Sequence, residues 1–127
     1  MTEVRMALRV LLVDDEEDIV ELIQDRLEAY GFKVTTAGTG LEALKRLSVE
    51  KFDGVFLDVK MPEMGGIEAL EEIRATDKQI PVIIITASST REAALEAMNK
   101  GANEYVLKPF DWEELKAKIE KVYNIAL

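Results

Sequence analysis

The chain has 127 residues, with 25 Asp or Glu against 16 Lys or Arg and with no His and no Cys, so its formal charge is −9. The missing residue types exclude disulfides, thiolate nucleophiles, cysteine zinc sites and any mechanism that needs a histidine of this chain. The acidic balance argues against direct contact with nucleic acid or anionic lipid, and the lack of a long apolar run argues against a membrane span or a secretory signal.

Short apolar or β-branched runs alternate along the chain with longer stretches whose apolar residues recur every three or four positions. Such runs predict buried strands, and such stretches predict amphipathic helices. The predicted strands cover residues 10–13, 33–37, 55–57, 81–86 and 105–107. The predicted helices cover about 16–30, ending at Gly31; a stretch after Gly40 with Leu41, Leu44 and Leu47; one with Ile67, Leu70 and Ile73; one with Ala94, Leu95 and Met98, ending at Gly101; and one with Trp112, Leu115, Ile119 and Val122, capped by Asp111.

This strict alternation of five strands with five helices predicts an α/β fold. Strands buried on both faces and joined by helices form parallel sheets with right-handed crossovers. A solenoid of similar period is less well supported because the units share no repeated consensus. No linker or charge block divides the chain. We therefore expect one cytoplasmic domain over residues 1–127, a doubly wound parallel sheet flanked by helices.

Polar side chains follow four of the five predicted strands. They are Asp14, Asp15 and Glu16 after the first strand, Asp58 after the third, Thr86 at the end of the fourth and Lys108 after the fifth. Ligands of open α/β sheets bind beyond the carboxyl ends of the strands. Two carboxylates about 5 Å apart repel by roughly 3 kcal/mol at an effective dielectric near 20. The cluster therefore needs a neutralising partner, which a hard cation such as Mg²⁺ supplies.

Each of these residues also has an ordinary interpretation when it is taken alone. Asp14 or Asp15 can cap a helix, and Asp58 can be a loop acid. Thr86 can be a β-branched strand residue and Lys108 a surface lysine. Their joint occurrence at the ends of the first, third, fourth and fifth strands is what favours a site.

At these positions the chain resembles the receiver domain of bacterial response regulators, the phosphoacceptor module of two-component signalling, of the chemotaxis-receiver kind. The resemblance covers about residues 9–123. Its motifs are Val10 to Glu16, Asp58 to Gly66, Ile85-Thr86-Ala87 and Gly101 to Phe110. It implies a flavodoxin-like sheet with strand order 2-1-3-4-5, an order named for this fold group.

The resemblance also implies a role for each acid. Asp58 becomes the phosphoacceptor, whose carboxylate forms an acyl phosphate. Asp15 and Asp58 become direct ligands of Mg²⁺, with Mn²⁺ as an alternative ion, and Asp14 acts through water. The main-chain carbonyl of Lys60 completes the metal ligands, and the Lys60 side chain affects the lifetime of the phosphoryl group.

The remaining implied site residues contact the phosphoryl group or respond to it. The Thr86 hydroxyl and the Lys108 ammonium each contact a phosphoryl oxygen, and the main-chain N–H groups of Val59 and Ala87 add donors. Thr86 is expected to swing toward the phosphate, and Tyr105, as the switch aromatic, fills the vacated space. By itself, Tyr105 is an ordinary half-buried strand aromatic.

The implied partners follow from the same resemblance. The phosphodonor is a sensor histidine kinase or a phosphotransfer protein, and because the chain has no His, the donor is another molecule or another domain. The fourth helix, fifth strand and fifth helix form the output face for a downstream protein or output domain, and this face allows a homodimer. The chain then catalyses only its own phosphorylation and dephosphorylation. Lys108-Pro109 is similar to a cis peptide of the family, whereas Gly65 departs from the Asp or Asn that is common there.

Two other functions fit part of the pattern. A hydrolase of the haloacid dehalogenase type also uses an aspartate nucleophile with Mg²⁺, but it is expected to carry Asp-x-Asp on its first strand and a cap insertion. Here Asp14 and Asp15 are adjacent, and no segment is long enough for a cap. A receiver-like interaction module without phosphate binding is expected to lack the acceptor, an acid or the lysine, all of which are present.

Overall fold

The structure is a computed structural model that describes residues 7–59, 64–87 and 91–127. Its strands are β1 (Arg9–Val13), β2 (Lys33–Ala37), β3 (Gly54–Leu57), β4 (Val82–Ala87) and β5 (Glu104–Lys108). Its helices are α1 (Glu17–Ala29), α2 (Gly40–Val49), α3 (Gly66–Thr76), α4 (Arg91–Asn99) and α5 (Trp112–Tyr123). The alternation expected from the sequence is confirmed, with small differences at the ends of the elements.

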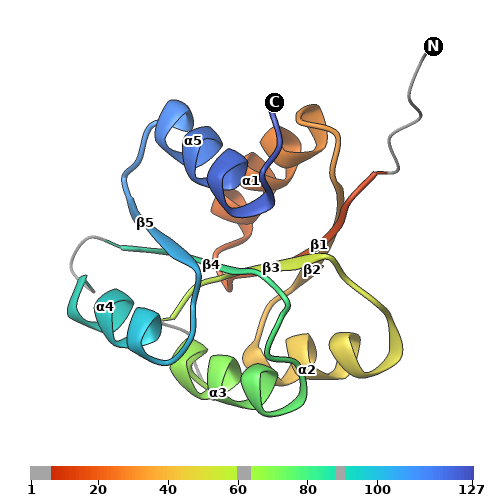
Figure 1. Cartoon of the computed structure of the whole chain (residues 1–127), viewed down its shortest axis with the longest axis vertical. Helices are drawn as coiled ribbons and strands as arrows, with labels where there is room; N and C mark the ends of the chain where they lie inside the picture. Colours follow the sequence, from red (N-terminus) through yellow and green to blue (C-terminus); the bar gives the residue numbers. More distant parts are fainter. Residues whose placement is uncertain (1–6, 60–63, 88–90) are drawn as a thin grey trace.

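The five strands form one parallel sheet in the order β2-β1-β3-β4-β5, which confirms the predicted fold class. Val13 at the end of β1 lies opposite Ala37 of β2 and Leu57 of β3. In Figure 1, α1 and α5 cover one face of the sheet and α2, α3 and α4 cover the other. From β1 the chain adds β2 on one side and then crosses to add β3 on the other side, so the strand order reverses between β1 and β3. Ligands of such sheets bind beyond the carboxyl ends of the strands at this point.

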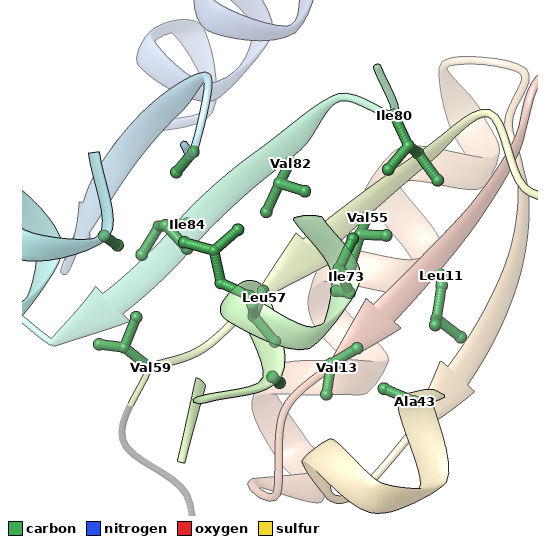
Figure 2. Close-up of a cluster of buried hydrophobic side chains, with 14 of the residues drawn as sticks. Leu11, Val13, Ala43, Val55, Leu57, Val59, Ile73, Ile80, Val82 and Ile84 are labelled. Atoms are coloured by element: carbon green, nitrogen blue, oxygen red, sulfur yellow. The ribbon is translucent and has the colours of Figure 1, made fainter. Parts of the chain in front are cut away.

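The central strands are buried on both faces because their side chains alternate between two cores. The α2–α4 core includes Leu11, Val13, Val55, Leu57, Val82 and Ile84, and Figure 2 shows these residues facing Ala43 and Ile73. The α1–α5 core includes Val10, Leu12, Phe56, Ile83, Ile85, Leu115 and Ile119. Each fully buried Leu or Ile side chain contributes roughly 1.5–3 kcal/mol. The two cores therefore hold the carboxyl ends of β1, β3 and β4 in fixed positions.

The helix ends have local causes that are visible in the sequence. Gly31 and Gly101 have φ angles of +100° and +111°, in the left-handed region that glycine adopts without steric cost. The predicted cap of α5 is confirmed, since the Asp111 carboxylate accepts a hydrogen bond from the Glu114 N–H at 2.7 Å. Thr39 caps α2 in the same way through its hydroxyl.

The packing of α2 differs from the face that its leucines suggest. Leu41 is 47% exposed, while Ala43 and Gly40 are buried. A Cβ at Gly40 would lie 2.9 Å from the main-chain oxygen of Met64. Small residues therefore let α2 approach its neighbours closely, and Leu41 is turned outward.

Among the described residues, no helix combines the length and the apolar character needed to cross a bilayer.

Candidate functional site

The candidate site lies beyond the carboxyl ends of β1, β3, β4 and β5. The Asp58 N–H donates to the Val13 carbonyl at 2.9 Å, and the Asp14 N–H donates to the Ala37 carbonyl at 3.1 Å. Both acids thus continue the main-chain pairing of β1 with its neighbours for one residue past the strand. The sheet itself therefore places the two side chains next to each other.

Asp58 and Thr86 form the buried floor of the site. Asp58 is 5% exposed and Thr86 is fully buried. The Thr86 hydroxyl donates a hydrogen bond to Asp58 Oδ1 at 2.8 Å. Thr86 is thus more than a β-branched strand residue, because its hydroxyl reaches the carboxylate at the end of β3.

Lys108 brings a positive charge to these acids from the edge strand β5. Its Nζ lies 2.7 Å from Asp14 Oδ2, 3.7 Å from Glu16 Oε1 and 3.9 Å from Asp58 Oδ2. The Lys108 side chain is 13% exposed, so it is not a solvated surface lysine. The Lys108–Pro109 peptide bond is cis.

These contacts change the acid–base properties of Lys108. Burial by itself would lower its pKa, but the hydrogen bond to Asp14 and the negative charges of Asp14, Asp58 and Glu16 raise the pKa of Lys108 above its ordinary value. An ammonium whose charged form is favoured in this way stays protonated near neutral pH. The site therefore holds a permanent cation.

Three carboxylates meet at the site, and one of them differs from the predicted set. Oxygens of Asp14, Glu16 and Asp58 all lie within 4.8 Å of one another. Asp15 is exposed and lies outside this group. An all-oxygen donor set of this kind fits a hard divalent cation such as Mg²⁺. Lys60, predicted to offer a carbonyl, lies outside the described residues.

The start of α1 explains the position of Glu16. The N-cap residue of α1 is Glu16, which makes no side-chain capping bond. Asp14 Oδ1 instead accepts from the Glu16 N–H at 3.1 Å, so neither Asp14 nor Asp15 is the N-cap residue. This turn brings the longer Glu16 side chain back over the site. The sequence places Glu16 in the acidic run, but the local signal does not separate it from Asp15.

The other predicted residues lie around this centre. Val59 is buried directly after Asp58, and its carbonyl accepts from the Gly66 N–H at 3.0 Å. Ala87 is the exposed last residue of β4. Tyr105 is half-buried on β5 and packs against the α2–α4 core. Tyr105 is thus on the same strand as Lys108 but nearer its amino end.

An apolar groove that was not predicted from the sequence adjoins the site. Its lining includes Leu22 and Ile23 of α1 and Phe110 and Trp112 near the start of α5, with Lys108 at its border. Its volume is about 560 Å³. Leu22 is 57% exposed, so the α1 side of the groove is open to solvent.

Comparisons with known proteins agree with this geometry. The family model of the response regulator receiver domain matches residues 10–120. The transcriptional regulatory protein ZraR of Escherichia coli K12 is 42% identical over 112 residues, which are 88% of this chain and 25% of ZraR. The chain thus spans about a quarter of the length of that relative.

Two solved structures are similar over nearly the whole chain. The response regulator TrrA of Thermotoga maritima, in complex with Mg²⁺ and BeF, gives a TM-score of 0.83 at 40% identity, covering 92% of this chain and 99% of TrrA. A second structure is the receiver domain of a sensor histidine kinase of Pseudomonas aeruginosa PAO1, with magnesium in its active site cleft. It gives a TM-score of 0.84 at 29% identity and covers 94% of this chain and 100% of that domain. The haloacid dehalogenase alternative is therefore set aside, and the chain belongs to the response regulator receiver domain family.

Proposed function

We propose that the chain is a phosphorylation-dependent signalling switch that accepts a phosphoryl group on Asp58 from a histidine kinase or a phosphotransfer protein. The observation that carries this proposal is the buried Asp58 carboxylate, with the Thr86 hydroxyl at 2.8 Å and the Lys108 ammonium at 3.9 Å. A carboxylate between a neutral donor and a fixed cation is suited to accept phosphorus. The chain then catalyses only its own phosphorylation and dephosphorylation.

The proposed transfer uses the Asp58 carboxylate as the nucleophile. One of its oxygens forms a bond to phosphorus while the bond from phosphorus to the donor nitrogen breaks, and the electron pair of that bond leaves with the donor. Phosphoryl transfer depends mainly on positioning and on stabilising the charge of the equatorial oxygens. Lys108 supplies a positive charge, Thr86 supplies a hydroxyl donor, and the N–H groups of Val59 and Ala87 are proposed as further donors.

We propose Mg²⁺ as the cofactor, with Mn²⁺ as an alternative ion. Asp15, Asp58 and the Lys60 carbonyl are the proposed direct ligands, with Asp14 acting through water. The position of Glu16 beside Asp14 and Asp58 makes it a further candidate. When bound, the ion supplies positive charge that offsets the repulsion between these carboxylates and the incoming phosphoryl oxygens. TrrA, which is 40% identical, was solved with both Mg²⁺ and BeF.

The output is proposed to leave the site through Thr86 and Tyr105. A phosphoryl group on Asp58 draws the Thr86 hydroxyl away from its present bond, and Tyr105 of β5 moves into the vacated space. This reshapes the α4-β5-α5 face and shifts an equilibrium between two states. We propose that this face controls a downstream protein or output domain in the cytoplasm and also allows a homodimer, without direct contact to nucleic acid by this domain.

Intact mass spectrometry after treatment with acetyl phosphate and Mg²⁺ tests the acceptor. We expect the wild-type chain to gain one phosphate that hydroxylamine removes, and the Asp58→Ala variant to gain none. Asp25→Ala, which removes an exposed carboxylate of α1, is the matched control and should react as the wild type does. An adduct that survives in Asp58→Ala would refute the assignment. An unreactive wild type would instead favour an interaction module without phosphate chemistry.

A further inference from the structure

The ammonium group of Lys118 contacts Tyr105 in two ways. Lys118 Nζ donates a hydrogen bond to the main-chain carbonyl of Tyr105. The same atom lies 4.9 Å from the centroid of the Tyr105 ring, within the distance at which a cation is attracted to an aromatic face. One side chain of α5 thus holds both the main chain and the ring of the same β5 residue.

Glu104, the residue before Tyr105 on β5, completes this arrangement. Its Oε1 accepts a hydrogen bond from the Tyr105 N–H at 3.1 Å and lies 3.8 Å from Lys118 Nζ. Its Oε2 lies 3.3 Å from Lys121 Nζ. The Glu104 side chain is only 14% exposed, so its charge is held by these partners and little screened by solvent. The N–H and the carbonyl of Tyr105 are therefore both bonded to charged side chains.

The position of β5 explains why this matters. β5 is an edge strand, with β4 as its neighbour in the sheet, so its outer main-chain groups have no strand partner. Figure 1 shows α5 on one face of the sheet and α4 on the other. Lys118 belongs to α5, whereas Tyr105 packs against the core on the α4 side. Lys118 therefore links the two helical layers across the edge of the sheet.

We infer that Lys118 is a positioning residue for Tyr105, with its ammonium held between Glu104 at 3.8 Å and Glu114 of α5 at 3.6 Å. When the Tyr105 ring rotates away from Lys118, the attraction between the ammonium and the ring is lost. This loss changes the ratio of the ring position near Lys118 to the position turned away from it by about two- to fivefold. Lys118 thereby favours the ring position of the unmodified protein. The inference rests on the proposed function in one respect, namely that movement of Tyr105 transmits the signal.

Fluorine NMR of protein labelled with 3-fluorotyrosine tests the inference. The chain has three tyrosines, and Tyr105→Phe identifies the Tyr105 resonance. Lys118→Met removes the charge while keeping a similar length, and we expect it to shift the Tyr105 resonance and leave those of Tyr30 and Tyr123 unchanged. Lys118→Arg should restore the wild-type position, because guanidinium also binds an aromatic face. Lys116→Met, on the same helix, is the charge-matched control.

The same spectra with Mg²⁺ and beryllium fluoride separate the two proposals. In Lys118→Met we expect the ratio of Tyr105 positions to change by about two- to fivefold relative to wild type. A second variant, Glu104→Gln, should shift the Tyr105 resonance in the same direction. A Tyr105 resonance unchanged in both variants overturns the role of Lys118. If Mg²⁺ with beryllium fluoride leaves the wild-type spectrum unchanged, the proposed function is contradicted. The spectra recorded without these ions still test whether Lys118 positions Tyr105.

Discussion

Gly66 packs directly on the main chain of the proposed acceptor, which makes it a sharp test of how the site is built. A Cβ added at Gly66 would lie 2.3 Å from the Asp58 carbonyl oxygen and 2.4 Å from Val59 Cα. Real Cβ atoms do not approach other atoms this closely. Because both obstacles are main chain, no flexible side chain can move aside. The Gly66→Ala substitution must therefore displace either the start of α3 or the Asp58–Val59 segment.

The expected size of the effect follows from two opposing contributions. Overpacking a well-packed site costs about 1–3 kcal/mol of the free energy of unfolding. Alanine in place of glycine in a helix recovers up to about 1 kcal/mol, but Gly66 is only the first residue of α3. We expect a net loss of about 1–2 kcal/mol. Displacement of Asp58 should also slow its phosphorylation by on the order of tenfold or more, because catalytic groups tolerate little misplacement.

The neighbouring Gly65 is the matched control. A Cβ at Gly65 would lie 3.7 Å from the Val59 carbonyl oxygen, an ordinary contact. Gly65→Ala changes the N-cap of α3 and should cost less than about 1 kcal/mol. Urea unfolding followed by Trp112 fluorescence measures stability, and the rate of adduct formation with acetyl phosphate measures the site. If Gly66→Ala matches Gly65→Ala in both assays, the reasoning about close approach to Asp58 is wrong.

Two further predictions use charge. Lys108→Ala should leave the fold largely intact but uncouple modification of Asp58 from partner binding, so a titration that shows a normal phosphate-dependent response would contradict the role of Lys108. Burial, with a smaller contribution from Asp53, raises the pKa of Tyr123 above its ordinary 10.0. The unfolded chain therefore loses this proton at lower pH than the folded chain, and stability falls as the pH rises past about 10. Tyr123→Phe should make this loss of stability smaller, as measured by urea unfolding at pH values below and above about 10. If the free energy of unfolding of Tyr123→Phe falls with pH as steeply as that of the wild type, this explanation is wrong.

The fold was largely predictable because its strongest signals are local. β1, β3 and β4 are buried on both faces, so they read as continuous apolar runs. The stops at Gly31 and Gly101 reflect left-handed φ angles. The strand order depends on pairing between residues far apart in the chain, which no local pattern encodes, and it came from the family resemblance. The outward turn of Leu41 depends on small residues in α2 and on its neighbours, so periodicity alone does not predict it.

The candidate site was predictable as a place but not in every detail. Parallel strands bring their carboxyl ends to one edge, so the convergence of Asp14, Asp58 and Lys108 follows from the topology. The turn between β1 and α1 decides how the consecutive acids are placed. Asp14 is buried, whereas Asp15 and Glu16 are both exposed, and a Glu16 oxygen lies near those of Asp14 and Asp58. Side-chain direction in a short turn is a tertiary property, and the sequence offers no periodic pattern for it.

If Asp58 is the acceptor as proposed, the charges of the site favour a rearrangement when it is phosphorylated. At an effective dielectric near 20, the attraction of Lys108 to Asp14 at 2.7 Å is about 2 kcal/mol stronger than that to Asp58 at 3.9 Å. The ammonium is therefore held mainly by Asp14 while Asp58 is unmodified.

An acyl phosphate on Asp58 would carry up to about two negative charges in place of the single charge of the carboxylate, a net gain of about one beside Lys108, and would reverse this preference. The ammonium then turns toward the phosphate and leaves Asp14 without its strongest partner. Three carboxylates against one ammonium already carry an excess of two negative charges, the charge of one divalent cation. Lys108 alone cannot neutralise both the acids and the phosphate, so phosphorylation of Asp58 should depend on a divalent cation even though a lysine is present.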